Sequence, residues 1–211
     1  MNKGIIKNIF SSFAKENPNP KTELLFTNNY TMLVAVVLSA QATDIGVNKA
    51  TKDLFDLIST PEEMVALGEE ELKKHVRTIG LFNSKAKNII KLSHILVESY
   101  HSQIPESLEE LIKLPGVGTK TAKVVLNAAF NRNEIAVDTH VFRTSRRLGI
   151  TNKKTIPSVE KDLPTQIPKE WQLKAHHWLV LHGRYICKAR KPLCEDCFLK
   201  EYCKFFKSQK N

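Results

Sequence analysis

A lysine, an aspartate and four cysteines are the residues of this sequence whose types and spacing favour chemistry. Lys120 follows the two glycines of the stretch PGVGTK, and Asp138 follows the apolar run from Ile135 to Val137. A neutral lysine amine is a nucleophile, and a carboxylate can take up a proton or stabilise a developing positive charge. If folding brings Asp138 near Lys120, the pair has the parts of a covalent catalyst.

The four cysteines all lie near the C-terminus, with the spacing Cys187-x6-Cys194-x2-Cys197-x5-Cys203. A disulfide framework would spread cysteines through the chain of a small secreted protein, so metal binding explains them better. Four thiolates within 17 residues suit a [4Fe-4S] cluster or a structural zinc ion. Zinc sites usually have two close cysteine pairs, and this sequence has one. The spacing therefore favours the cluster over zinc and over unligated thiols.

Lys120 is predicted to stand at the start of a helix that follows a tight turn. The stretch SLEELIKL opens with the capping-box residues Ser107 and Glu110 and continues with apolar residues at helical spacing. A proline and a glycine end that helix, and TKTAKVVLNAAF resumes the helical pattern. The pattern predicts a helix-hairpin-helix motif over about residues 108–127. An ordinary turn between two helices is the alternative.

The hairpin glycines also predict anion binding. Backbone N–H groups near the start of the second helix can approach an anion, and a DNA phosphate is the natural anion for a basic protein. The residues expected to make this contact are Gly116, Val117, Gly118 and Thr119. A cation in the first turn opposes the helix dipole, while the same field favours loss of the Lys120 proton. Lys120 could instead contact a phosphate, and Asp138 could serve only as a helix N-cap.

The elements that must position these residues are helices. Apolar residues recur at helical spacing along the chain, for example in SKAKNIIKLSHILVESY with Ser84 as its expected N-cap. The segment from Thr31 to Ala50 contains no turn residue before Gly46, and no alternating strand pattern occurs in the sequence. The fold class is therefore expected to be all-α.

The composition is that of a globular protein with a polyanionic partner. The chain has 211 residues, of which 42% are hydrophobic and 26% charged, and its net charge is +10. Residues 184–211 hold eight Lys or Arg against three Asp or Glu, which amounts to +5. The longest apolar run, Met32 to Leu38, is far shorter than the ~18 residues of a membrane span. Because the N-terminus also lacks a signal-peptide pattern, we expect a cytoplasmic protein without a membrane partner.

Taken together, these motifs resemble the endonuclease III family of DNA glycosylases and AP lyases, within the helix-hairpin-helix glycosylase superfamily. The resemblance covers nearly the whole chain through LSAQATD, TIGLFNSKAKNI, LPGVGTKTAKVVLN, VDTHVFR, HHWLVLHGRYIC and the four cysteines. It implies two helical domains that flank a DNA-binding cleft. Residues 22–132 would form a six-helix domain with the hairpin, and residues 1–21 with 133–211 would form an iron–sulfur cluster domain.

The resemblance also implies a function, the removal of oxidised or ring-damaged pyrimidines from double-stranded DNA in base excision repair. Lys120 matches the Schiff-base lysine of the family, and Asp138 matches its catalytic aspartate. The lysine would attack C1′ of the flipped nucleotide, and β-elimination would nick the strand 3′ to the abasic site. The four cysteines match the ligands of a structural [4Fe-4S] cluster. A monomer at the nucleoid is expected, because a single cleft needs no second subunit.

Four further residues are expected to contact DNA. Leu81 resembles a wedge that enters the base stack, and Gln41 resembles a plug for the vacated space. Arg190 and Lys191 lie in the six-residue loop between the first two cysteines and would contact the phosphate backbone. The alternatives are that Leu81 packs against a neighbouring helix, that Gln41 is a solvated helix end, and that the basic run is a solvated face.

The sequence also leaves two other functions open. An adenine glycosylase of the same superfamily shares the hairpin, the aspartate and the cluster, but lacks the hairpin lysine and has a further C-terminal domain. Lys120 and a chain that ends at Asn211 favour the lyase instead. A non-catalytic hairpin module is the third class, and it would need neither Lys120 nor Asp138.

Overall fold

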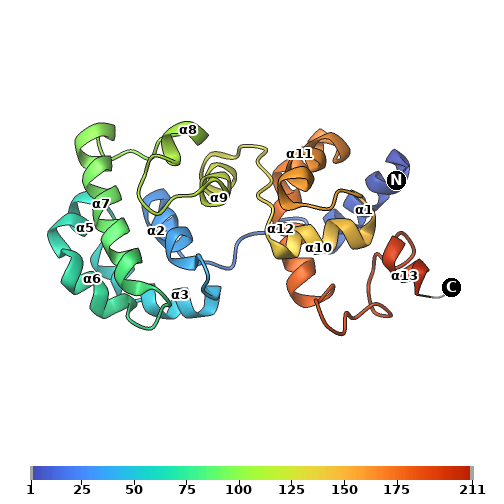
Figure 1. The fold of residues 1–211 in the computed structure, drawn as a ribbon, viewed down its shortest axis with the longest axis horizontal. Coiled ribbons are helices and arrows are strands. Elements are labelled where there is room, and N and C mark those ends of the chain that lie inside the picture. Colours follow the sequence, from blue (N-terminus) through green and yellow to red (C-terminus); the bar gives the residue numbers. More distant parts are fainter. Residues whose placement is uncertain (1, 210–211) are drawn as a thin grey trace. The chain divides into compact units, whose positions relative to one another are not determined.

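A computed structural model describes residues 2–209, and every regular element in that part of the chain is helical. Thirteen α-helices follow one another among these residues without a strand (Figure 1). The prediction of an all-α fold is confirmed. No helix of the described residues is long and apolar enough to cross a membrane.

The chain folds into two compact units, each with its own apolar core. One unit is the continuous segment Glu23–Asn131, which we call the hairpin unit. The other combines Met1–Thr22 with Arg132–Asn211, and we call it the cysteine unit. The chain therefore leaves the cysteine unit after its N-terminal helix and returns to it after the hairpin unit is complete.

The hairpin unit is built around one helix that is buried along nearly its whole length. Its helices are α2 (Asn29–Ser39), α3 (Asp44–Thr51), α4 (Leu54–Leu57), α5 (Pro61–Leu67), α6 (Glu69–Val76), α7 (Phe82–Tyr100), α8 (Leu108–Leu111) and α9 (Thr119–Phe130). Every residue of α2 from Tyr30 to Leu38 is buried, because its apolar run leaves no polar face for solvent. Figure 1 shows α2 lying between α7 and α9. Helix α2 thus packs against both α7 and α9.

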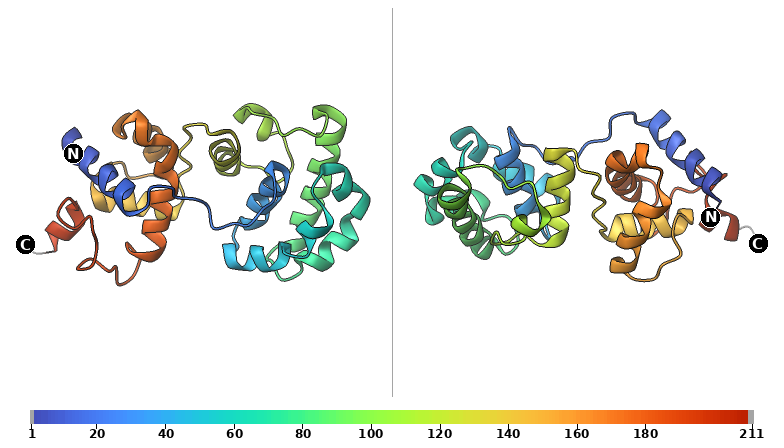
Figure 2. Two further views of the ribbon diagram at one scale, coloured as in Figure 1. Left: turned by 180° about the vertical axis from the view of Figure 1, so that it is seen from behind. Right: turned by 90° about the horizontal axis from the view of Figure 1, so that it is seen from above.

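The cysteine unit joins the first helix of the chain to the last ones. Its helices are α1 (Lys3–Glu16), α10 (Thr139–Leu148), α11 (Ile156–Gln166), α12 (Lys169–Tyr185) and α13 (Lys204–Ser208). Helix α1 packs beside α12 (Figure 2). The ring of Phe13 stacks on Trp178 with 5.9 Å between centroids, and the Trp178 indole N–H donates to the Asn17 carbonyl at 2.8 Å. The N-terminal segment is therefore part of this core.

Two local expectations about helix boundaries differ from the structure. Helix α7 begins at Phe82, so Ser84 lies within its first turn and the prediction of Ser84 as the N-cap is wrong. A break also separates α2 from α3 before Gly46, where the Thr43 hydroxyl accepts the Gly46 N–H at 3.1 Å. The Thr43 hydroxyl caps α3, so the chain breaks here without a glycine or proline. Because those two residues are the usual sequence signals of a turn, the break was not predicted.

Candidate functional site

The hairpin is a close turn between α8 and α9 that is anchored on two other helices. Gly116 has φ 81°, a left-handed conformation that favours glycine. A Cβ at this position would lie 3.1 Å from the Asn88 Cβ and 3.3 Å from the Val37 Cγ1. Glycine is therefore required both by the backbone and by the close approach to α7 and α2. Val117, the next residue, is buried and fixes the turn in the core.

The residues that follow the turn face open space. A Cβ added at Gly118 would meet no heavy atom within 4 Å. Gly118 is the N-cap of α9 and provides no side-chain hydrogen bond to the helix. Thr119 and Lys120 follow in the first turn and are both exposed. The N-terminal end of α9 thus offers backbone N–H groups and an exposed lysine on one surface, as an anion site requires.

Asp138 is the N-cap of α10. Its Oδ1 accepts the backbone N–H of Val141 at 2.8 Å, and the side chain is half-buried. The three apolar residues before it, Ile135 to Val137, are buried and hold the start of the helix in place. The N-cap interpretation is confirmed. Lys120 belongs to the hairpin unit and Asp138 to the cysteine unit.

Gln41 and Leu81 share an uncommon backbone conformation. Their φ angles are 57° and 60°, in the left-handed region that non-glycine residues seldom occupy. Gln41 is exposed just beyond the end of α2, as the interpretation of a solvated helix end also expects. Leu81 is 64% exposed at the start of α7, so it does not pack beneath a neighbouring helix. Such strain persists only where the surroundings impose it.

A buried lysine near these two loops was not found by sequence reasoning. Lys85 is 6% exposed, and its Nζ donates to the carbonyl of Leu38, at the end of α2, at 2.9 Å. Burial lowers the pKa of this ammonium group. The sequence signal was slight, since Lys85 stands in a helical stretch with several other lysines and nothing local separates it from them.

The four cysteine side chains line one small cavity of the cysteine unit, together with apolar residues around α12 and α13. All four are free thiols. Burial raises the pKa of Cys194 and Cys203, and it raises the pKa of Cys197 to about 11. Isolated thiolates are therefore unfavourable in this place, and a positively charged metal centre would offset their cost.

This donor set fits an iron–sulfur cluster. Four thiols and no carboxylate line the cavity, which is the soft ligand set that such clusters use. In the described part of the chain, no group of three or more His, Cys, Asp or Glu side chains is arranged to hold a single metal ion. A cluster has no need of such an arrangement, because each thiolate binds a different iron.

His182 also lines this cavity. Its Nε2 lies 3.6 Å from the Cys197 sulfur, and burial lowers the pKa of His182 to about 4. A neutral imidazole adds no charge beside the four sulfurs, and it can donate a hydrogen bond to one of them.

Two arginines of α10 hold the loop that begins at Cys187. Arg143 donates from Nε to the Cys187 carbonyl at 2.9 Å and from Nη2 to the Gly183 carbonyl at 2.7 Å. Arg147 donates from Nη1 to the Lys188 carbonyl at 2.7 Å, with the same nitrogen 3.7 Å from the Cys187 sulfur. The helix that Asp138 caps is therefore bonded directly to the cysteine loop, which the sequence alone did not reveal.

The basic residues of that loop are exposed. Arg190 and Lys191 both lie at the surface, and Lys191 has a left-handed φ of 50°. The carbonyl of Ala189, one residue earlier, accepts from Nη2 of Arg147 at 3.2 Å. The loop thus presents its cations to solvent while its backbone is fixed from within.

Comparison with known proteins agrees with this site. The family model of the HhH-GPD superfamily of base excision DNA repair proteins matches residues 34–169. The model of the iron–sulfur binding domain of endonuclease III matches residues 187–203, a span that begins and ends at cysteines.

Individual relatives match over almost the full chain. Endonuclease III of Rickettsia prowazekii is 57% identical over 96% of this chain and 95% of its own length. Endonuclease III of Escherichia coli K12 is 48% identical over 97% of each chain. A solved structure of a trapped endonuclease III–DNA covalent intermediate superposes with a TM-score of 0.90 and 44% identity, covering 100% of both chains.

The hairpin, the helical fold and the cysteine cavity define a helix-hairpin-helix protein of base excision repair. Within the HhH-GPD superfamily, this chain belongs to the endonuclease III family. It is a DNA N-glycosylase and abasic-site lyase, and its cofactor is a [4Fe-4S] cluster.

Proposed function

We propose that this chain excises oxidised or ring-damaged pyrimidines from double-stranded DNA and then nicks the strand 3′ to the abasic site through a Schiff base on Lys120. The observation that carries the proposal is the exposed Lys120 in the first turn of α9, directly after the open hairpin. A phosphate held by the N–H groups of Gly116 to Thr119 would bring the DNA backbone to this lysine. The adenine glycosylase alternative has no use for a lysine here.

The reaction we propose has two stages. The Lys120 amine attacks C1′ of a nucleotide extruded from the duplex, and the damaged base leaves with the electrons of the C1′–N bond. Asp138 takes up the proton released from the amine and stabilises the positive charge that develops at the sugar. The C1′–O4′ bond of this adduct then breaks and O4′ takes up a proton, which opens the sugar ring and gives the imine. Loss of a proton from C2′ of the imine then breaks the C3′–O bond, and the 3′ phosphate leaves with that electron pair. These steps require that DNA binding place Asp138 next to Lys120.

We further propose that the domains are residues 22–132 and residues 1–21 with 133–211, and that damaged DNA binds in a cleft between them. Gln41 and Leu81 would enter the base stack from the first domain, and Arg190 and Lys191 would contact phosphates from the second. Their exposure supports these roles. The protein would act as a cytoplasmic, nucleoid-associated monomer.

We assign the cluster to Cys187, Cys194, Cys197 and Cys203. When bound, the cluster supplies a fixed cross-link among the segments that carry these cysteines, and neither imine formation nor elimination needs a change of its oxidation state. Side chains of this unit position the loop and provide its DNA contacts. Arg143 and Arg147 orient the loop from within, and the exposed cations of the loop are presented to DNA.

Borohydride trapping tests the proposed nucleophile. Borohydride reduces an imine to a stable amine, so the wild-type protein is expected to form a covalent adduct with duplex DNA that contains thymine glycol or an abasic site. The variant Lys120→Ala should form none, and Lys52→Ala, which removes an exposed lysine at the end of α3, should trap as the wild type does. An adduct that persists in Lys120→Ala would move the nucleophile to another residue.

A further inference from the structure

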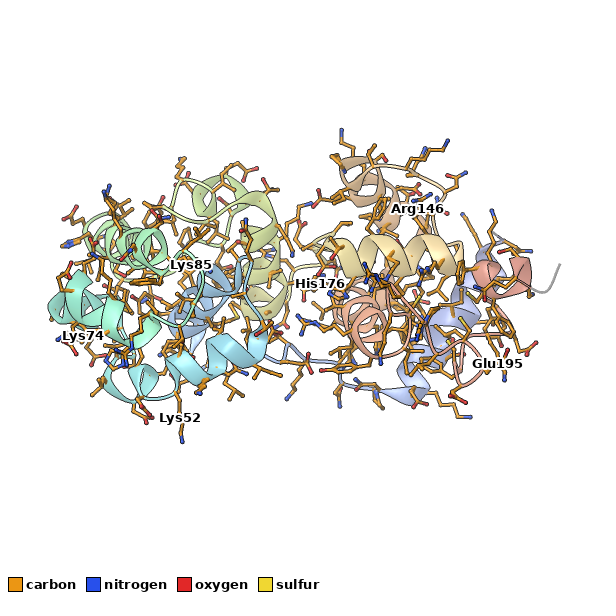
Figure 3. The ribbon with its side chains drawn as sticks, turned by 60° about the horizontal axis from the view of Figure 1, so that its bottom comes forward. Lys52, Lys74, Lys85, Arg146, His176 and Glu195 are labelled. Carbon is orange, nitrogen blue, oxygen red and sulfur yellow. The ribbon has the colours of Figure 1, made fainter. Side chains whose placement is uncertain are left out.

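Three loops expected to meet DNA converge on the last turn of α2. Gln41 follows the end of that helix directly, and the hairpin packs on it through the contact between Gly116 and Val37. The loop that carries Leu81 reaches it through Lys85, which lies between α7 and α2 (Figure 3). The end of α2 is therefore the common support of all three loops.

Lys85 links the segment that carries Leu81 to the helix end that precedes Gln41. Its backbone N–H donates to the Leu81 carbonyl at 3.1 Å, and its Nζ donates to the Leu38 carbonyl at 2.9 Å. The first bond belongs to the backbone of the first helical turn and places Lys85 one turn from Leu81. The second bond, made by the side chain, fixes the helix end from which Gln41 extends. The Nζ contact joins residues that are 47 positions apart in the sequence.

The Leu38 carbonyl has a specific need for this partner. The last four carbonyls of a helix lack intrahelical donors. In α2, the other three accept from the Ser39 hydroxyl, the Ala40 N–H and the Ala42 N–H. A cation at a helix C-terminus is also favoured by the helix dipole. The buried ammonium of Lys85 thus completes the end of α2 at the point where the chain turns toward Gln41.

We propose that Lys85 is a positioning residue for base extrusion, which holds the Gln41 loop and the Leu81 loop in the conformation that enters the duplex. The inference rests on the proposed function, because it takes Gln41 and Leu81 to be the residues that replace the extruded nucleotide. Lys85 is buried, so the proposal gives it no contact with the damaged base or the reacting sugar. Its contribution is to the unstacking step, which precedes the attack by Lys120.

Base extrusion can be followed with 2-aminopurine beside thymine glycol in a duplex, where the fluorescence rises when the stack opens. The protein carries Lys120→Ala in every arm of this experiment, so that the base is not released. Lys85→Met, which keeps the length and apolar character of the side chain, should reduce the fluorescence rise by about fivefold or more. The control is Lys91→Met, because Lys91 is an exposed lysine of the same helix. Lys91→Met should leave the fluorescence rise unchanged.

Single-turnover rates separate positioning from general stability. With Lys120 intact, Lys85→Met should slow excision of thymine glycol by about tenfold, since small misplacements of substrate-directed groups have effects of this size or larger. Cleavage of a preformed abasic site should stay within about threefold of wild type, because no base has to be extruded there. If Lys85→Met lowers the rates on both substrates equally and also lowers the unfolding temperature, Lys85 has a purely structural role. That result would overturn the proposal.

A double-mutant cycle tests whether Lys85 acts through the two loops. In a background of Gln41→Ala and Leu81→Ala, adding Lys85→Met should change the excision rate by less than about twofold, because groups that act as a unit are not additive. A further tenfold loss would overturn the proposal. Wild-type protein that fails to trap abasic DNA would defeat the proposed function itself. Trapping by the wild type, with Lys85→Met behaving like Lys91→Met, would defeat only this inference.

Discussion

At the scale of single residues, Asp138 has a capping role that can be separated from its proposed chemical role. Asparagine caps a helix about as well as aspartate, so Asp138→Asn should keep the bond to the Val141 N–H and leave the unfolding temperature nearly unchanged. The variant loses the carboxylate charge, and we expect glycosylase rates about 100-fold lower or more. Single-turnover excision and thermal unfolding measure the two effects.

Asp138→Ala provides the complementary variant. It removes both the carboxylate and the cap, and loss of the cap alone should lower the free energy of unfolding by about 1 kcal/mol. Wild-type excision by Asp138→Asn would contradict the proposed role of the carboxylate.

We expect His177 to make the stability of the cysteine unit depend on pH. Burial, together with the nearby His176, lowers the pKa of His177 to about 4 from 6.5. Above pH 6.5 both the folded and the unfolded chain hold this imidazole neutral. As the pH falls from 6.5 toward 4, only the unfolded chain takes up the proton, so the free energy of unfolding decreases. The total decrease in the free energy of unfolding from this group is on the order of 3 kcal/mol.

Urea unfolding at pH 7 and at pH 4 measures this dependence. His177→Gln should narrow the difference between the two values, while His94→Gln, at an exposed position of α7, should leave it unchanged. Equal pH dependence in His177→Gln and wild type would show that His177 is not the group responsible.

Among single residues, those whose role depends on local spacing could be predicted from the sequence. Those whose role depends on packing between helices could not. The cysteine spacing indicated a cluster, and the glycines predicted the hairpin, because both signals lie within a few residues of one another. Lys85 gave no such signal, since its partner Leu38 lies in another helix. Residue types suggested Lys120 and Asp138 as a possible pair, but only the family resemblance led us to expect that the two residues meet.

At the scale of elements, α10 connects the start of the proposed site to the cysteine loop. Asp138 begins this helix, and Arg147 near its end binds the Lys188 and Ala189 carbonyls while its guanidinium lies 4.5 Å from the centroid of the Phe205 ring. Arg147→Met removes the hydrogen bonds to the two carbonyls. We expect the cluster to be lost to a chelator about tenfold faster, as hydrogen bonds to charged groups contribute ~1.5–3 kcal/mol.

The decay of the visible absorbance of the cluster measures the rate of this loss. Arg146→Met is the matched control, because Arg146 is the preceding residue of the same helix, is exposed and contacts Phe142 instead of the loop. Identical decay in the two variants would mean that Arg147 does not hold the loop.

Element boundaries were less predictable than element types. Ser107 accepts the Glu110 N–H at 3.1 Å, so that cap was found from the sequence. The carboxylate of Glu110 instead bonds Tyr100 and Lys113, which leaves the predicted capping box half formed. The N-cap of α7 is a left-handed leucine, Leu81, which no propensity favours. Tertiary contacts decide both cases.

At the scale of the whole molecule, a net charge of +10 supports a DNA partner, but it does not say where the DNA lies. The last 28 residues carry half of that excess, and within them Arg190 and Lys191 are exposed on a loop whose backbone Arg147 fixes. Fixed cations lose less conformational freedom on binding than mobile ones do. Phosphate contacts at this loop are therefore expected to account for part of the salt dependence of DNA binding.

Replacing Arg190 and Lys191 with alanine should weaken binding to duplex DNA and make the binding less sensitive to salt. Each phosphate contact contributes about 0.9 to the slope of log K against log salt concentration, so the loss of two should reduce the slope by about 1.8. The measurement is a titration of DNA with a stable abasic analogue between about 50 and 200 mM salt. The double variant Lys153→Ala, Lys154→Ala removes the same charge from an exposed stretch between α10 and α11. If both double variants reduce the slope equally, the effect belongs to net charge and the loop makes no specific contact.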